Sequence, residues 1–183
     1  LTLTVAAGEM VQVSALDSVE HTRLWDLLSL RQPAEHRLWV EGRELPLKRR
    51  HEFAHHRILV EDFSPGQLSV FYNLHAYDNI LMPVQRRIRV ARLFTGRGYR
   101  YVLRRDSGFL GRPLEDQPLR GMTRNEMLAL LVARWKVFNP KLILLHNAFY
   151  TADVLGKEIL WQGLRSLTER GTAVLTVESD IIA

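Results

Sequence analysis

The segment His51-Glu52-Phe53-Ala54-His55 has the residue types and spacing of a zinc hydrolase. On an α-helix, H-E-x-x-H places two imidazoles one turn apart on one face, where they bind zinc while the glutamate acts as a base. The flanking residues Lys48-Arg49-Arg50 and Arg57 are cationic and oppose a dication, and no G-x-x-H extension supplies a third ligand. We therefore favour a short solvated helix over 48–56 and keep a zinc hydrolase as an alternative.

A second segment, Ala15–Thr22, lies where a phosphate-binding loop would lie, between a short strand and a helix predicted to begin at Thr22. Such a loop requires G-x-x-x-x-G-K-[ST], of which only Thr22 is present. Glycines permit the positive φ that wraps the loop around phosphate, whereas the β-branched Val19 resists it. Glu20 would place a negative charge against a polyanion, and His21 replaces the lysine with a mostly neutral ring. The residues alone favour an ordinary strand-to-helix loop capped by Thr22.

The elements that would position these residues are those of an α/β sheet, because buried strands alternate with helices in the last third of the chain. Thr123-Arg124-Asn125-Glu126 is a capping box that begins a helix with one apolar stripe. Strands are predicted at 1–5, 10–13, 37–40, 58–60, 142–145 and 173–177, and helices at 22–30, 123–138 and 153–168, with partial helix over 69–105. The residues predicted to face the core in the helix at 123–138 are Met127, Leu130, Leu131, Trp135 and Phe138. Those in the helix at 153–168 are Ile159, Leu160, Leu164 and Leu167.

Composition limits the class of protein. The chain has 183 residues, which favours one domain, and it has no cysteine, which excludes disulfides and thiol chemistry. No apolar run reaches the ~18 residues of a membrane helix, so a cytoplasmic location is expected. Eight arginines lie between Arg86 and Arg105. We interpret them as a solvated face, with phosphates or an acidic partner as the alternative. No nucleic-acid partner is firmly predicted, because no nucleic-acid motif accompanies them. The beginning at Leu1 and the end after a strand suggest a fragment of a longer protein.

Several short segments, spread over nearly the whole chain, match motifs that one protein family carries in the same order. They are Gly8–Leu16, Glu41–Leu45, Leu59–Phe63 with Leu68–Val70 and Asp78–Ile80, Asn139–Leu145, Ala152–Val154 and Val177–Asp180. Together they resemble the ATPase subunits of sugar-type ABC importers, specifically the second cassette of those subunits. The family counterparts are G-E-I-L-G-V-S-G-L, D-G-x-x-[IVL], V-P-E-D-R with S-V-x-E-N-[IM], P-K-[VL]-L-I-L, the D-loop and [IV]-S-S-[DE].

The departures from this family fall on its chemistry. Where the family has the Walker B aspartate, which helps to hold Mg²⁺, and the glutamate, which polarises water, this chain has His146 and Asn147. The signature L-S-G-G-[NQ] is replaced by Met122–Glu126, the P-loop lysine by His21, and Ser179 lies at or beside the histidine switch. With the metal site, the base and the lysine lost, the resemblance implies a pseudo-ATPase that does not hydrolyse ATP by itself.

The resemblance implies a P-loop NTPase-like α/β fold with a mainly parallel core sheet, N-terminal antiparallel strands and a helical subdomain. The core would comprise 1–63 and 123–183, and the helical subdomain about 64–122. ATP and Mg²⁺ are the implied ligands, at the retained positions Thr22, Glu61 and Asp153, with no catalytic residue and no protein metal site.

The implied partners are a membrane permease and a second cassette. The helical subdomain and a loop at Glu61-Asp62 would contact the permease, which would hold the chain at the inner face of the cell membrane. A non-catalytic regulatory or interaction module on the same fold is the alternative.

Overall fold

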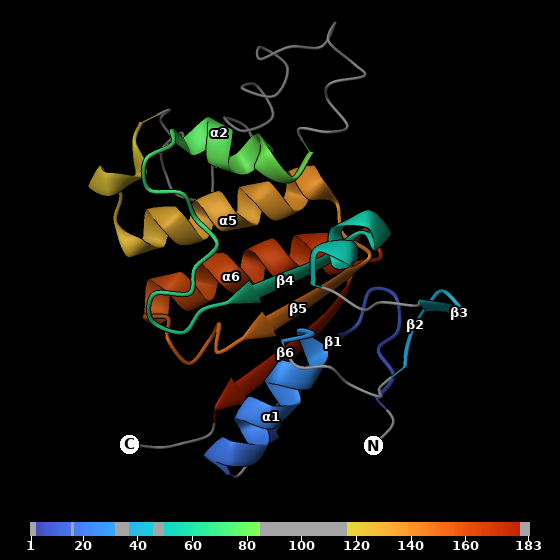
Figure 1. The fold of residues 1–183 in the computed structure, drawn as a ribbon. Coiled ribbons are helices and arrows are strands. Elements are labelled where there is room, and N and C mark those ends of the chain that lie inside the picture. Colours follow the sequence, from blue (N-terminus) through green and yellow to red (C-terminus); the bar gives the residue numbers. More distant parts are fainter. Residues whose placement is uncertain (1–2, 16, 32–36, 46–49, 85–116, 180–183) are drawn as a thin grey trace, which may run out of the picture. The chain divides into compact units, whose positions relative to one another are not determined.

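The computed structural model describes residues 3–15, 17–31, 37–45, 50–84 and 117–179, and it divides the chain into two compact units. The first unit comprises residues 1–68, 140–151 and 170–183, and the second comprises 69–139 and 152–169 (Figure 1). The arginine-rich stretch from Arg86 to Arg105 lies outside the described residues. Among the described helices, none combines the length and the apolar character needed to span a bilayer.

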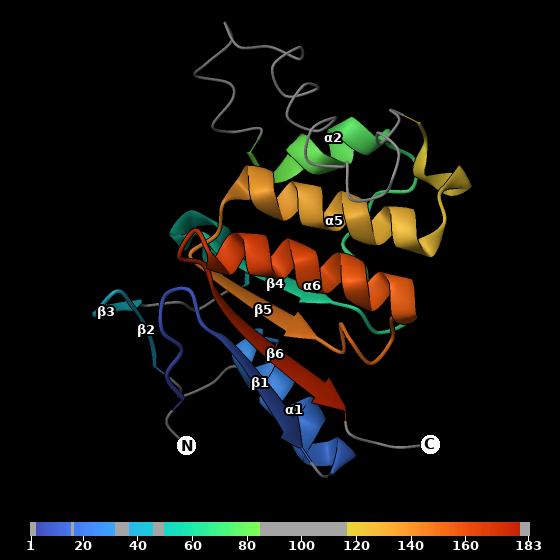
Figure 2. The same cartoon turned by 180° about the vertical axis from the view of Figure 1, so that it is seen from behind.

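The first unit is built on a parallel four-stranded sheet in the order β1-β6-β5-β4 (Figure 2). The strands are β1 (Met10–Ala15), β4 (Ile58–Asp62), β5 (Leu142–His146) and β6 (Ala173–Ser179). β5 and β6 are buried along almost their whole length, as the continuous apolar runs predict for parallel strands. Because all four strands run in the same direction, their carboxyl ends meet at one edge.

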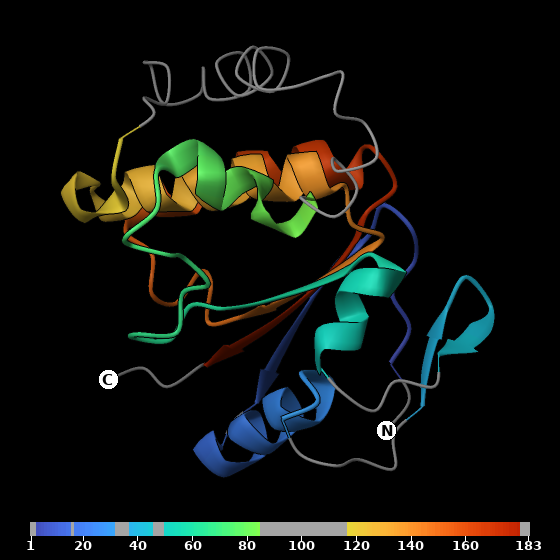
Figure 3. The same ribbon diagram turned by 45° about the horizontal axis from the view of Figure 1, so that its top comes forward.

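One face of this sheet is covered by α1 (Ser18–Leu28) and the 3₁₀-helix η1 (Arg50–His56) (Figure 3). The core between them contains Trp25, Phe53, Ile58, Leu144, Leu175 and Val177. A separate antiparallel hairpin joins β2 (Leu38–Val40) to β3 (Arg43–Leu45). Its turn residues Glu41 and Gly42 have positive φ values of 53° and 72°. Glycine is suited to the second position because residues with a side chain rarely adopt this left-handed backbone conformation.

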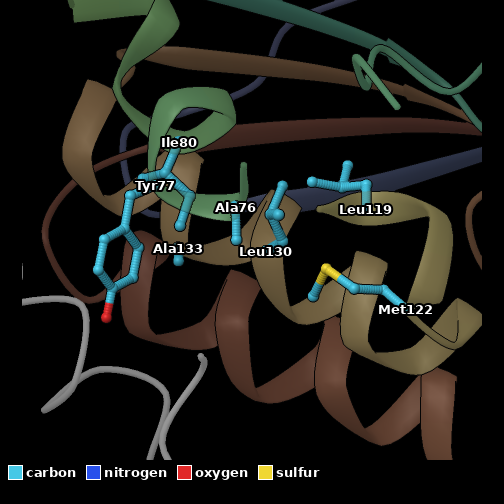
Figure 4. Close-up of a cluster of buried hydrophobic side chains, with 7 residues drawn as sticks. All are labelled: Ala76, Tyr77, Ile80, Leu119, Met122, Leu130 and Ala133. Atoms are coloured by element: carbon cyan, nitrogen blue, oxygen red, sulfur yellow. The ribbon is translucent and has the colours of Figure 1, made fainter. Parts of the chain in front are cut away.

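The described residues of the second unit include five helices: α2 (Ala76–Leu81), η2 (Met82–Val84), η5 (Leu119–Gly121), α5 (Arg124–Phe138) and α6 (Val154–Thr168). Tyr77 and Ile80 of α2 pack against Leu130 and Ala133 of α5 in a buried cluster (Figure 4). The remaining members of the cluster are Ala76, Leu119 and Met122. α5 and α6 pack closely at Gly163, where an added Cβ would lie 2.5 Å from Cγ1 of Val132.

Several sequence predictions are confirmed. The strand predicted at 37–40, the buried strands and the inward residues of α6 are present, and the capping box forms with both of its reciprocal hydrogen bonds. α5 ends at Asn139, which adopts the left-handed conformation before Pro140.

Other predictions are wrong. Residues 3–5 form no strand, and α1 begins at Ser18 rather than Thr22 because Asp17 caps it earlier. The sequence predicted one apolar stripe along α5, but α5 is buried on nearly all sides. The spacing of apolar residues indicates one buried face and cannot indicate the neighbours that cover the others. Glu61 and Asp62 are buried residues within β4 and do not form a loop.

Candidate functional site

The polar side chains of the first unit converge at the carboxyl edge of the sheet. The register places Asp62 beside His146 and His146 beside Val177, while Ala15 lies beside Ser179. Ligands of open parallel sheets bind outside the carboxyl ends of the strands. This edge is therefore the candidate functional site, and its side chains decide which ligand it accepts.

Asp62 is the centre of a buried hydrogen-bond network and is 1% exposed. Its Oδ2 accepts from Trp25 Nε1 at 3.2 Å and from the Arg31 guanidinium at 2.7 Å. Its Oδ1 accepts from the backbone N–H of Ser64 at 3.0 Å and lies 2.9 Å from His146 Nδ1. One carboxylate thus joins α1, the segment after α1, β5 and the segment after β4.

The network keeps Asp62 ionised. Burial raises the pKa of Asp62, but the hydrogen bonds from His146 and Ser64, with the attraction to His146, lower it more, so the pKa lies below its ordinary value. An ionised carboxylate only accepts hydrogen bonds, so Nδ1 of His146 is the donor. Ser64 Oγ is 3.3 Å from the same ring nitrogen. Serine and aspartate therefore share one nitrogen, which excludes the serine–histidine–aspartate relay, in which they contact opposite nitrogens.

The His146 ring is stacked on two aromatic rings of α1. Its centroid is 4.8 Å from that of His21 and 4.7 Å from that of Trp25, with interplanar angles of 26° and 6°. His21 and His146 are 5% and 8% exposed. Nε2 of His146 is buried and has no hydrogen-bond partner among the described residues. Two positions that the sequence places far apart, 21 and 146, therefore meet as packed rings.

The described ends of β1 and α1 leave a shorter connection than a phosphate-binding loop has. Only Leu16 and Asp17 separate β1 from α1, whereas the phosphate-binding pattern keeps more residues between its strand and its helix. The carboxylate of Asp17 accepts from the backbone N–H of Val19 at 2.9 Å, and Glu20 adds a second negative charge to the first turn. The positive end of the helix is thus already stabilised by the chain's own carboxylates.

Asn147 and Glu178 stabilise the turn that follows β5. Asn147 has a φ of 51°, a left-handed conformation that asparagine tolerates, and its Oδ1 accepts from Ser179 N at 2.9 Å. Glu178 is 3% exposed and accepts from the backbone N–H groups of residues 148, 149 and 150, and from the hydroxyl of Thr176 at 2.9 Å. The side-chain oxygen at position 147 is therefore used to fix the backbone.

The three retained positions have different surroundings. Thr22 is exposed and its hydroxyl donates to the Ser18 carbonyl at 2.9 Å, while Glu61 is 3% exposed within β4. Asp153 belongs to the second unit, where it caps α6 by accepting from Gly156 N at 2.6 Å and receives Asn125 Nδ2 at 3.2 Å. The hydrogen bonds from Gly156 and then Asn125 lower the pKa of Asp153.

The H-E-x-x-H segment does not have the geometry of a zinc site. His51 and His55 lie in the 3₁₀-helix η1, where three residues complete a turn. Residues four apart then differ by about 120° around the axis, so the two imidazoles do not share a face. Within the described ranges, no three histidine, aspartate or glutamate residues are arranged to hold a metal ion. The geometry therefore argues against the zinc-hydrolase alternative.

Sequence reasoning missed the roles of Trp25, Arg31 and Glu178. Each acts through a tertiary contact with a residue at least 28 positions away, such as Trp25 with Asp62. No spacing pattern within a few residues of Trp25, Arg31 or Glu178 indicates these contacts.

Comparisons with known proteins identify the fold. No protein-family model matches the chain. The ribose import ATP-binding protein RbsA of Geobacillus kaustophilus is 18% identical over 184 residues, which cover 99% of this chain and 37% of that protein. The chain thus spans little more than a third of the length of this relative.

Solved ATP-binding cassettes of ABC transporters match almost the whole chain. The dimeric post-hydrolysis state of MJ0796 bound to ADP and Pi matches with a TM-score of 0.73 and 18% identity, covering 98% of this chain and 78% of that one. The ADP conformation of MJ1267 gives 0.72 with 15% identity and coverages of 98% and 73%. A nucleotide-free cassette gives 0.71 with 14% identity and coverages of 98% and 74%. The chain therefore has the fold of an ABC ATPase cassette, with a parallel core sheet and an antiparallel pair.

Proposed function

We propose that this chain is the nucleotide-binding-domain part of an ABC transporter of the sugar-importer type, and that it does not hydrolyse ATP by itself. The fold and the order of the sequence motifs support the transporter assignment. The weak similarity to a ribose import protein supports the sugar type. The inability to hydrolyse ATP is inferred from the side chains at the carboxyl edge of the sheet.

The stacked pair of His21 and His146 is the observation that carries this proposal. The family pattern has a phosphate-binding lysine at the first position and a Mg²⁺-holding aspartate at the second. Here the rings lie 4.8 Å apart and are buried, so position 21 has no long ammonium side chain to reach a phosphate and position 146 has no carboxylate for the metal shell. One preorganised electrostatic contact is commonly worth about 3 kcal/mol of transition-state stabilisation, so losing two of them lowers the rate by about four powers of ten.

Position 147 supports the same conclusion. A carboxylate at this position would orient and polarise the attacking water. Asn147 has an amide instead, and its oxygen already accepts from the Ser179 backbone. The chain therefore lacks the base as well as the metal ligand, and the short connection before α1 leaves no loop for the phosphates.

A role within a pair of cassettes remains compatible with these losses. Of the retained positions, Thr22 and Asp153 are exposed, whereas Glu61 is buried in β4. We propose Asp153 as the side chain through which this chain could contact ATP and Mg²⁺ held by a second cassette, and Thr22 as the position that would contact a nucleotide bound in this chain's own site. Glu61 would act only through the packing of the strand.

The loop of the second unit that contains Phe71 and Tyr72 has the exposed aromatic residues expected of a surface that contacts a permease. Phe71 and Tyr72 are 50% and 47% exposed, which is unusual for adjacent aromatic residues. The loop backbone is held by the buried Asn79, whose amide accepts from Phe71 N at 2.8 Å and donates to the carbonyls of Phe71, Leu74 and His75.

A buried arginine fixes this loop further. Arg134 of α5 is 4% exposed and donates to the carbonyls of Asn79 and Ser69. A surface that is already ordered loses little entropy on binding, and aromatic residues supply most of the affinity at such surfaces. We therefore propose that Phe71 and Tyr72, rather than Glu61 and Asp62, contact the membrane permease at its cytoplasmic face.

Calorimetric titration of ATP with Mg²⁺ into the purified chain, combined with an assay of phosphate release, tests the proposal. The cassette MJ0796 serves as a positive control, and circular dichroism establishes that the chain is folded. We expect neither saturable heat nor phosphate release from the chain alone. Saturable one-site heat that Thr22→Ala weakens would show that the chain binds nucleotide in its own site, and phosphate release above the buffer rate would refute the inability to hydrolyse ATP.

The transporter assignment has its own test, which is co-purification with a co-expressed permease in detergent. We expect Phe71→Ser and Tyr72→Ser to weaken the complex while Trp39→Ser, which removes an exposed aromatic side chain from the hairpin, leaves it unchanged. A chain that associates with no permease would instead be the regulatory module that the sequence left as an alternative.

A further inference from the structure

The turn that follows β5 directs three successive backbone N–H groups towards one carboxylate. Ala148 N and Phe149 N donate to Oε1 of Glu178 at 3.1 and 3.4 Å, and Tyr150 N donates to Oε2 at 3.0 Å. The hydroxyl of Thr176 donates to Oε1 at 2.9 Å. Successive N–H groups that converge in this way form a concave site for anions.

The charge of Glu178 is stabilised by these donors rather than by a cation. Glu178 is 3% exposed, and its partners in the described part of the chain are four neutral donors. Burying a carboxylate costs much free energy unless hydrogen bonds or a counter-charge replace its water. Backbone N–H groups can only donate, so this site selects a group that only accepts, which is an anion.

The backbone of this turn is also held by contacts that do not involve the side chain of Glu178. Asn147 N donates to the Val177 carbonyl at 2.9 Å, and Asn147 Oδ1 accepts from Ser179 N at 2.9 Å. Thr151 donates to the Asn147 carbonyl through its backbone N–H at 3.3 Å and through its hydroxyl at 3.0 Å. The turn should therefore keep its shape when the side chain at position 178 is shortened.

The start of α1 is a second place on this edge of the sheet where a backbone donor holds a carboxylate of the chain itself. There the carboxylate of Asp17 accepts from one backbone N–H, that of Val19. The turn after β5 encloses its carboxylate more fully, with three N–H groups and a hydroxyl. This turn is therefore the stronger anion site of the two.

We propose that the N–H groups of residues 148–150 form a binding site for a small carboxylate, and that Glu178 occupies this site in the natural chain. As an intramolecular ligand, Glu178 competes with external oxyanions at a high effective concentration. The natural chain thus keeps this part of the carboxyl edge closed to external oxyanions. Shortening the side chain opens the site to formate or acetate, because each of them presents the same two oxygens on one carbon. The site belongs to the turn alone and does not depend on whether the chain binds nucleotide.

Urea unfolding of Glu178→Ala in sodium formate tests the site, with sodium chloride at equal ionic strength as the reference. We expect formate to stabilise this variant, with each tenfold rise in formate above its dissociation constant adding about 1.4 kcal/mol to the free energy of unfolding. Glu178→Gln is the matched control, because it loses the same charge while its side chain still fills the site. Glu178→Gln, Glu169→Ala and the natural chain should respond equally to the two salts. A formate response of Glu178→Ala no larger than that of the natural chain would overturn the proposal.

Amide resonances locate the bound anion. Formate should shift the amide signals of residues 148–150 in Glu178→Ala and leave those of the natural chain unchanged. Stabilisation without these shifts would assign formate to another place on the chain and refute the proposal.

If Glu178→Ala folds in neither salt, acid titration of the natural chain supplies the test through the same resonances. The amide signals of residues 148–150 should move together with the signal of the Glu178 carboxyl carbon, because these N–H groups hold its charge. Amide signals that do not follow this carbon contradict the site.

Discussion

Replacing Asp62 with asparagine tests whether its carboxylate holds α1 against the sheet. The substitution conserves the shape of the side chain but removes its charge. One oxygen becomes an NH₂ group, which would face donors such as Trp25 Nε1 or the Arg31 guanidinium. A donor facing a donor cannot form a hydrogen bond, so at least one buried contact is lost. The network would then be only partly satisfied in a buried environment.

The magnitude follows from the burial of the partners. Removing one member of a buried ionic pair costs about 3–5 kcal/mol, because the other is left uncompensated. Arg31 reduces this cost, since its side chain is 33% exposed and regains water when the contact is lost. The Nδ1–H of His146, a residue that is 8% exposed, would lose its carboxylate acceptor and could not regain a hydrogen bond from water. We therefore expect Asp62→Asn to lower the free energy of unfolding by about 3 kcal/mol, the lower end of that range.

The pH dependence gives an independent check. The pKa of Asp62 is lowered from its ordinary value of 3.8 in the folded chain, so the folded state favours the ionised form. The resulting stabilisation is fully present above the unfolded pKa and is lost as the pH falls below it towards the folded pKa. The difference in stability between the natural chain and Asp62→Asn should thus be constant near neutral pH and shrink below about pH 4.

Urea unfolding followed by circular dichroism measures both effects. Glu169→Gln is a matched control, because it breaks the exposed pair with Arg165 and should cost no more than about 0.5 kcal/mol. If Asp62→Asn is as stable as this control at pH 7, or if its deficit does not change with pH, the network does not hold α1 in the way inferred.

Three further substitutions test other parts of the fold. Glu178→Gln removes the charge that accepts three backbone N–H bonds and should lower the free energy of unfolding, measured in urea, by about 1.5–3 kcal/mol. A variant as stable as the natural chain would contradict this role of Glu178. Gly163→Ala should lower the midpoint temperature of thermal unfolding, because the new Cβ would lie 2.5 Å from Val132. Adding Val132→Ala should restore part of the loss. A double variant no more stable than Gly163→Ala would contradict the close packing of α5 and α6 at this point. Thr123→Ala removes the cap of α5 and should cost about 1 kcal/mol, measured in the same urea assay, whereas Thr123→Ser should cost little.

The local elements were largely predictable because their signals lie within a few residues. The capping box at Thr123 and Glu126 depends on a spacing of three residues, and it formed as predicted. The apolar runs at 142–145 and 173–177 identified buried parallel strands, because a strand covered on both faces has no polar alternation. The start of α1 was missed, since both Asp17 and Thr22 are good capping residues and only the local backbone selects between them.

The sequence by itself determined the order of the elements and, through the resemblance, the fold class that the solved cassettes now support. Through the same resemblance it also predicted that positions 21, 146 and 147 depart from the family's chemistry. Only the tertiary structure decided that His21 and His146 stack, that Asp62 joins four segments and that Asn147 is used to fix a backbone. The physical reason is that these contacts join residues up to 125 positions apart. Their geometry is set by the register of parallel strands and by the placement of α1, and no local pattern encodes either.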